Sequence, residues 1–216
     1  MFSRVTKAIK AFTERRFVII FSENEKEADL AIPAQEVTAE AVIFLAKVAS
    51  GLLCLALPRS RLKELEIDSL PSRYRVTDTP FYSPVDAKEV QNSGISAQDR
   101  AFTIKKVIDP NTRPEDLARP GHVMLLGAHP DGVIGRDGHT EAVVTLCQLA
   151  GVYPGGLLCE LVSDSGDMMN AKELKALAKR FKIPIITVGA LAEFTRYFLR
   201  QKKGQDLTIK QNSSRL

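Results

Sequence analysis

The stretch Glu141–Val162, EAVVTLCQLAGVYPGGLLCELV, decides the fold class. Apolar side chains in its first ten residues recur at the spacing of a helix that packs one face on a core. The glycines and proline of GVYPGG then end the helix. The apolar run Leu157–Val162 that follows predicts a buried strand. A helix followed after a short loop by a buried strand indicates an α/β protein.

The same alternation extends in both directions. Buried strands are predicted at Arg16–Phe21, Gly51–Pro58 and residues 183–188. The residues Thr38, Ser96 and Asn170 each precede a helical pattern as an N-cap, which predicts helices to about Ala49, Ile108 and Phe181. Further helices are expected near the N-terminus, at Ser60–Glu66 and from about Leu191. The segment 69–94 reads as a long loop with one strand near Phe81–Ala87.

Composition limits the class of protein. With 216 residues, 44% hydrophobic and 26% charged, the chain suits one soluble globular domain. No uninterrupted apolar run approaches the ~20 residues of a membrane helix, and the N-terminus lacks the apolar core of a signal peptide. Cys54, Cys147 and Cys159 sit in apolar settings without paired spacing, so we expect buried thiols in a cytosolic protein.

The net charge of +4 is distributed unevenly. Residues 1–16 carry +4 and residues 195–216 carry +5, so the body between them carries −5. Whether the basic ends are solvated helices or contact a partner stays open. An acidic body suits a cation site better than a groove that follows nucleic-acid phosphates, so no nucleic acid is expected as a partner.

Four acids alternate directly after the first predicted strand: Glu23, Glu25, Glu27 and Asp29. Like charges on one face repel each other, so the spacing needs an external reason. One reason is a solvated edge. The other is a divalent cation such as Mg²⁺, which takes oxygen ligands from one or two carboxylates together with substrate and water.

The segment GRDGHTE, residues 135–141, precedes the helix of the opening stretch. Arg136, Thr140 and the N–H groups of the helix start can bind a phosphate, and His139 can ligate a metal or carry a proton. Alternatively, Thr140 is only an N-cap, Glu141 complements the helix dipole, and His139 is an ordinary loop histidine.

Glu160 directly follows a buried apolar run and precedes a polar turn. Active-site acids often lie at the carboxyl end of a strand, where a glutamate can transfer protons. The alternative is that Glu160 pairs with a lysine or arginine.

Together with SGLLCLAL, GISAQDRAFTI, RPGHVMLL, GRDGHTEA and GLLCELVSDSGDM, these features resemble the 3,4-dihydroxy-2-butanone 4-phosphate synthase family over roughly Phe17–Tyr197. The resemblance implies a single α/β domain at residues 1–200, with a mixed sheet flanked by helices, and a polar, frayed tail at 201–216. It implies a homodimeric lyase of riboflavin biosynthesis with sites near the subunit interface. The reaction converts D-ribulose 5-phosphate to L-3,4-dihydroxy-2-butanone 4-phosphate and formate, with two Mg²⁺ or Mn²⁺ ions and no organic cofactor.

The resemblance also implies residue roles. Glu25 and His139 would hold the metal, Arg136 and Thr140 would bind the substrate phosphate, and Glu160 would be an acid/base residue. Glu27 and Asp29 would line an acidic loop over the substrate, and Cys54 and His122 match further pocket residues of the family.

The acidic loop departs from the family pattern Asp-Arg-Glu-x-Glu-Gly-Asp at three positions, of which the exchange of the first aspartate for Glu23 keeps the charge. Asn24 replaces the arginine, which removes a cation, and Ala28 replaces the glycine, which matters if φ is positive there. Lys26 would point away from the acids in an extended segment. We therefore expect a divergent member. The alternatives are an enzyme for another phosphorylated ketose and a non-catalytic protein that binds sugar phosphates.

Overall fold

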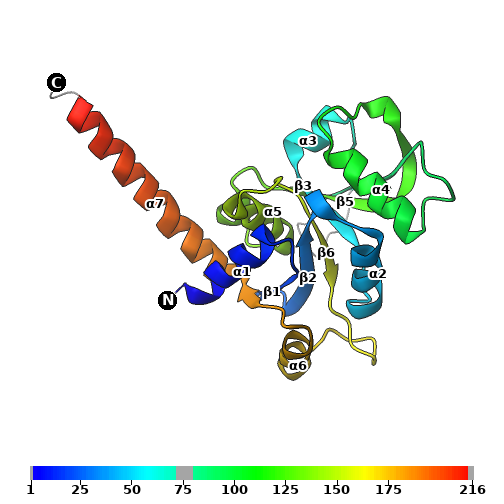
Figure 1. Cartoon of the computed structure of the whole chain (residues 1–216), viewed down its shortest axis with the longest axis horizontal. Coiled ribbons are helices and arrows are strands. Elements are labelled where there is room, and N and C mark those ends of the chain that lie inside the picture. Colours follow the sequence, from blue (N-terminus) through cyan, green and yellow to red (C-terminus); the bar gives the residue numbers. More distant parts are fainter. Residues whose placement is uncertain (1, 72–79, 214–216) are drawn as a thin grey trace.

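A computed structural model describes residues 2–71 and 80–213, and these form one seven-stranded sheet between two layers of helices (Figure 1). The strand order is β4-β5-β3-β6-β2-β1-β7. Parallel pairs (β1 with β7, β3 with β5) and antiparallel pairs (β1 with β2, β2 with β6, β3 with β6, β4 with β5) coexist. The α/β class and the mixed sheet are thereby confirmed.

The strands are β1 (Val18–Ser22), β2 (Glu27–Pro33), β3 (Cys54–Pro58), β4 (Phe81–Ala87), β5 (Leu117–Ala128), β6 (Gly156–Glu160) and β7 (Ile185–Thr187). The α-helices are α1 (Ser3–Thr13), α2 (Ala39–Val48), α3 (Arg59–Glu64), α4 (Ala97–Ile108), α5 (His139–Ala150), α6 (Ala171–Phe181) and α7 (Val188–Ser213). Short 3₁₀ turns are η1 (Ala34–Glu36), η2 (Pro114–Asp116) and η3 (Gly132–Ile134).

Each face of the sheet has its own apolar core. Helices α1, α5 and α7 cover one face, where Phe12 and Leu146 are fully buried. Helices α2, α3, α4 and α6 contribute to the core on the other face, where Leu45 and Ile104 are fully buried. Because the central strands bury side chains on both faces, their sequences are almost continuously apolar.

The predicted helix starts are confirmed by their caps. The Thr38 hydroxyl accepts the Ala41 N–H, and the Ser96 hydroxyl accepts the Asp99 N–H. Asn170 accepts the N–H groups of Lys172 and Glu173, and the Glu173 carboxylate accepts the Asn170 N–H in return. Each cap satisfies donors that a helix start leaves without partners.

The acidic stretch is the main correction to the predicted fold. Only residues 23–26 form a turn, and Glu27 and Asp29 lie in strand β2 instead of a loop. Strand β2 pairs with strands on both sides and is buried on both faces, so its sequence shows no alternation that would reveal it. Lys26 has φ 58° in the turn and is not extended, whereas Ala28 lies in the strand without positive φ and needs no glycine.

The structure also bears on Pro84 and on the predicted loop at 69–94. Pro84 lies in the edge strand β4, where the pairing with β5 shifts register between Tyr82 and Val85 and accommodates a residue without an N–H. The predicted loop at 69–94 lies partly outside the described residues.

Helix α7 begins at Val188, directly after β7, and extends away from the body past α1 (Figure 1). Among the described residues, no helix combines the length and the apolar character needed to cross a membrane.

Candidate active site

A small pocket of about 120 Å³ brings together most of the predicted site residues. It lies where the β1–β2 turn, the first residues of β2 and β3, the end of β6 and the N-terminus of α5 meet. Its lining is formed by Glu25, Glu27, Asp29, Cys54, Phe81, Leu126, His139, Thr140, Leu158 and Glu160. Segments that are more than 100 residues apart in sequence therefore form one acidic cavity.

Two carboxylates in the pocket come from neighbouring strands in direct register. Asp29 of β2 pairs with Glu160 of β6 across the antiparallel ladder, so both side chains point to the same face. Glu160 Oε2 accepts the Leu52 N–H at 2.7 Å. A Cβ at position 51 would lie 2.5 Å from this oxygen, so Gly51 leaves room for the glutamate. Among the described residues, Glu160 thus pairs with a backbone amide and with no lysine or arginine.

Glu25 and His139, the predicted metal ligands, are in contact. Glu25 Oε2 lies 2.9 Å from His139 Nδ1. The turn that presents Glu25 is held by Ser22, whose hydroxyl accepts the Glu25 N–H. His139 is the first residue of α5 and only 8% exposed, so both side chains face the cavity instead of bulk water.

The charges of this pair depend on each other. The hydrogen bond from His139 lowers the pKa of Glu25, with Arg136 as a further positive neighbour. Burial alone would lower the pKa of His139, but the Asp29 carboxylate and the bond to Glu25 raise it to about 9. In the absence of a cation, the imidazolium itself therefore balances the surrounding acids.

The pKa values of Asp29 and Glu27 are raised, in contrast to that of Glu25. Burial raises the pKa of Asp29 to about 7, and the nearby Glu160 and Glu27 carboxylates add to this effect while His139 opposes it. Burial also raises the pKa of Glu27, with Glu25 as its next cause. A carboxyl that ionises near neutral pH can both accept and return a proton during a reaction.

The predicted phosphate site lies at the start of α5. Gly138 is the N-cap, so Thr140 is a residue of the first turn and not the cap. Thr140 is only 2% exposed and lines the pocket. Arg136 is not among the lining residues, but its positive charge lowers the pKa of Glu25. Its Nη1 is 2.6 Å from Glu141 Oε2.

The three cysteines are buried free thiols, as predicted. Cys54 lines the pocket, and its burial raises the thiol pKa far above the usual range, as do the nearby Glu160 and Asp29 carboxylates. A thiol in this environment stays protonated and is a poor nucleophile. We therefore assign Cys54 to the shape of the cavity and not to bond-making chemistry.

Like Arg136, the predicted site residue His122 is not among the residues that line this pocket. It lines a separate cavity of about 290 Å³ together with Leu52, Ile95 and Arg100. The His122 imidazole is held by Asp86, whose Oδ2 is 2.6 Å from Nδ1 and whose Oδ1 accepts the His122 N–H. The two cavities flank the Gly51–Leu53 segment, since Leu52 lines one and its N–H binds a carboxylate of the other.

Sequence reasoning missed two contacts around the pocket. Asn24 Nδ2 donates to Asp137 Oδ2, which joins the acidic turn to the segment that carries Arg136. Glu141, expected only to complement the helix dipole, is fully buried beside Arg136. The first contact has no local signal, since its residues lie 113 positions apart.

The donor set fits a hard divalent cation. Within residues 2–71 and 80–213, no three histidine, cysteine or acidic side chains already surround one point as a metal site. However, His139 Nε2 and Asp29 Oδ1 are buried without a hydrogen-bond partner among the described residues. Buried polar atoms of this kind call for a ligand or water. Mg²⁺ commonly binds through one or two protein carboxylates and completes its shell with substrate oxygens and water.

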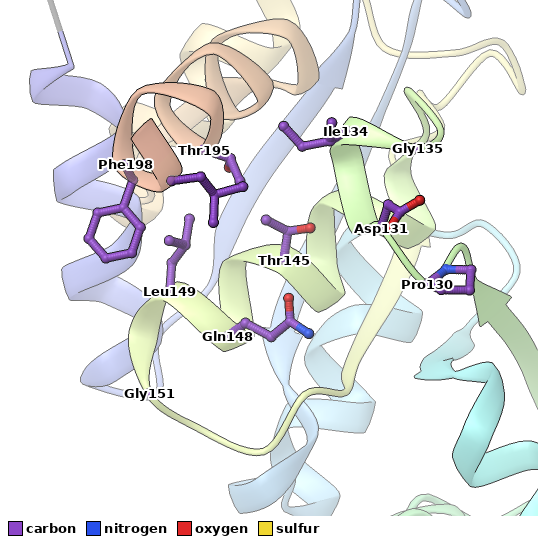
Figure 2. Close-up of a pocket in the computed structure, with 11 residues that line it drawn as sticks. Pro130, Asp131, Ile134, Gly135, Thr145, Gln148, Leu149, Gly151, Thr195 and Phe198 are labelled. Atoms are coloured by element: carbon purple, nitrogen blue, oxygen red, sulfur yellow. The ribbon is translucent and has the colours of Figure 1, made fainter. Parts of the chain in front are cut away.

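A larger cavity lies away from this chemistry. It measures about 670 Å³ and is lined by residues of η3, α5 and α7, among them Ile134, Leu149, Thr195 and Phe198 (Figure 2). Its lining includes one carboxylate, Asp131, and lacks the clustered acids and the imidazole of the smaller pocket. The smaller cavity is therefore the candidate active site.

Comparison with known proteins identifies the family. The family model of 3,4-dihydroxy-2-butanone 4-phosphate synthase matches residues 6–194. The synthase of Agrobacterium fabrum is 37% identical over 90% of this chain and 92% of its own length. The chain belongs to the 3,4-dihydroxy-2-butanone 4-phosphate synthase family.

Solved structures of synthases agree with the fold. A synthase in complex with two magnesium ions superposes with a TM-score of 0.85 at 32% identity, covering 89% of this chain and 96% of that one. The Candida albicans synthase gives a TM-score of 0.82 at 35% identity, covering 90% of this chain and 98% of the other. Riboflavin biosynthesis protein RibBA of Aquifex aeolicus is 41% identical over 93% of this chain. The match covers 50% of that longer protein.

Proposed function

We propose that this synthase-family chain converts D-ribulose 5-phosphate to L-3,4-dihydroxy-2-butanone 4-phosphate and formate. The observation that carries the proposal is the contact between Glu25 and His139 in one cavity with Asp29 and Glu160. This arrangement would place a cation site and proton-transfer groups around one small sugar.

Glu25 and His139 would hold the divalent cation, and the magnesium complex of a related synthase supports this choice. One or two such ions, Mg²⁺ or Mn²⁺, would stabilise negative charge on neighbouring sugar oxygens. The imidazole favours Mn²⁺ more than an all-oxygen site would.

The side chains around the sugar have separate tasks. Arg136 and the first turn of α5 with Thr140 would fix the phosphate. Glu160 and Asp29 would take and return protons at carbon and oxygen, because enolisation removes a carbon-bound proton and dehydration needs an acid. Glu27 would hold a sugar hydroxyl. Substrate and products contain the same atoms, so water lost in dehydration is regained when formate is released.

His122 enters the proposal through a second copy of the chain. Ile43, Leu52, Ile95 and Phe102 leave large apolar side chains 40–55% exposed. They belong to α2, α4 and the adjoining loops, and Leu52 and Ile95 rim the His122 cavity. We propose that a homodimer covers this face, named here the α2–α4 face, and that each copy directs His122 toward the partner's reaction pocket.

The oligomeric state of the protein in solution tests whether the α2–α4 face is a dimer interface. Phe102→Glu and Ile43→Glu should turn a dimer into a monomer in sedimentation experiments, because each would bury a charge in the contact. The matched control is Tyr197→Glu. Tyr197 lies on α7 and is 51% exposed, and its substitution should leave the dimer intact. A wild-type monomer at micromolar concentration, or a dimer broken only by Tyr197→Glu, would refute the α2–α4 face as interface.

The activity itself is tested by formate release, followed by NMR during incubation with ribulose 5-phosphate and Mg²⁺. Stoichiometric formate supports the synthase reaction. Depletion of substrate without formate would instead indicate a different kind of reaction on a phosphorylated ketose. Tight binding without depletion would indicate a sugar-phosphate-binding protein.

A further inference from the structure

Glu141 is a fully buried carboxylate beside the proposed phosphate site, and the proposed function gives it no task. It is the third residue of α5, and its side chain has 0% exposure. A carboxylate is almost never buried so completely unless specific partners hold it. Its partners therefore indicate what it does.

Both oxygens of Glu141 are occupied. Oε2 lies 2.6 Å from Arg136 Nη1, and Oε1 accepts the His129 N–H at 2.9 Å. His129 directly follows β5, so the carboxylate joins the arginine to the end of a core strand. With both oxygens engaged, the carboxylate has one orientation, and the guanidinium is held with only 18% of its side chain exposed.

Gly138 completes this arrangement. A Cβ at this position would lie 2.3 Å from Arg136 Nη1 and 2.9 Å from Glu141 Oε2. The arginine thus crosses over a residue that has no side chain, and any other residue would displace the ion pair. The backbone and the carboxylate together fix the guanidinium at the start of α5.

We propose that Glu141 is a positioning residue that aims Arg136 at the phosphate of the substrate. The inference rests on the phosphate-binding role of Arg136 in the proposed function. A guanidinium carries its donors in a rigid fork that binds two anionic groups along different edges. Glu141 holds Nη1 of Arg136 and reduces the freedom that this arginine would lose when it binds phosphate.

The test uses Glu141→Gln, Arg136→Gln and the double variant, with inorganic phosphate as the probe in calorimetry. The amide keeps the volume of Glu141 but removes the charge that holds the guanidinium. Glu141→Gln should weaken phosphate binding about tenfold or more, as for a lost charge-assisted contact. Because Glu141 acts through Arg136, the double variant should bind phosphate no more weakly than Arg136→Gln alone.

Glu173→Gln is the matched control. Glu173 is also the third residue of a helix, but its carboxylate accepts the Asn170 N–H on the surface, so phosphate binding should be unchanged. Thermal unfolding verifies that each variant is folded. Should Glu141→Gln prove unfolded, Glu141→Asp takes its place; its shorter side chain cannot hold both partners, and it should show the same loss.

Three results would overturn the inference: normal phosphate binding by a folded Glu141 variant, single effects that simply add in the double variant, or no phosphate binding by the wild type. Formate release is measured separately on the wild type. The proposed reaction and the positioning role can therefore fail independently.

Discussion

Asn24 Nδ2 donates a hydrogen bond to Asp137 Oδ2 over 2.9 Å, and this bond joins two segments of the candidate site. Asn24 precedes Glu25, and Asp137 lies between Arg136 and His139 in the sequence. The bond therefore helps to keep the acidic turn next to the start of α5. Asn24 stands where the family pattern has arginine, and its contact shows how the shorter side chain still serves this turn.

Asn24→Ala should loosen the acidic turn and raise the Mg²⁺ concentration needed for half-maximal formate release. Because one hydrogen bond is lost, this Mg²⁺ concentration should rise roughly two- to tenfold. Asn24→Arg should retain function, because its guanidinium can pair with Asp137. Asn111→Ala, which removes a similar contact to Asp109 on the surface, is the control. An unchanged metal dependence in Asn24→Ala would show that the contact is not needed.

Mg²⁺ should raise the melting temperature of the protein through Glu25 and His139. A ligand at a hundred times its Kd stabilises the folded state by about 2.7 kcal/mol. The rise should vanish in His139→Ala and in Glu25→Gln. It should persist in Glu23→Gln, which changes an acid of the same turn that does not line the pocket. Calorimetric scans with and without Mg²⁺ measure the effect, and a rise that survives in His139→Ala would place the ion elsewhere.

Asp29→Asn should stabilise the metal-free protein at alkaline pH. The carboxyl ionises near pH 3.8 when unfolded and near 7 in the fold, so the folded state binds more protons between these values. Stability therefore falls as pH rises through this window, and the cost at pH 8 is at most about 4 kcal/mol. Asparagine removes that cost.

Urea unfolding from pH 4 to 8 measures this difference. The gap between Asp29→Asn and wild type should be present at pH 8 and shrink toward pH 4. Asp131→Asn is the surface control, since the Asp131 side chain is 76% exposed in the wild type. A constant gap at all pH values would mean that ionisation of Asp29 is not its cause.

Glu160→Gln should abolish formate release and leave phosphate binding intact. The amide preserves an acceptor for the Leu52 N–H but cannot exchange protons, and loss of a general acid or base lowers kcat by about 10²–10⁴-fold. Single-turnover formate yield and phosphate calorimetry separate the two effects. Glu115→Gln, with an exposed side chain, serves as reference. An unchanged formate yield would remove Glu160 from the chemistry.

The sequence predicts the helices of this fold better than it predicts the site. Caps such as Ser96 and Asn170 are local signals, and the structure confirms them. Strand β2 was missed because its burial on both faces removes the alternation that identifies strands. Glu25 and His139 were paired only through family resemblance, since no local pattern relates residues brought together by the sheet.

The remaining site features depend on packing that no single segment contains. The separation of His122 from the candidate active site follows from its bond to Asp86 and from the position of the Gly51–Leu53 segment. The role of Glu141 depends on His129, twelve residues earlier, and on the missing side chain at Gly138. Such contacts become visible only when the strands and α5 are placed together.

The register of Asp29 opposite Glu160 limits how this chain can change length. Successive strand residues face opposite sides, so inserting or deleting one residue in the turn 23–26 would tend to rotate Asp29 out of the cavity or force a bulge. Substitutions there, such as the asparagine at position 24, keep the count and are tolerated more easily. Among homologues that retain activity, we therefore expect this hairpin to vary in residue type and to be constant in number of residues.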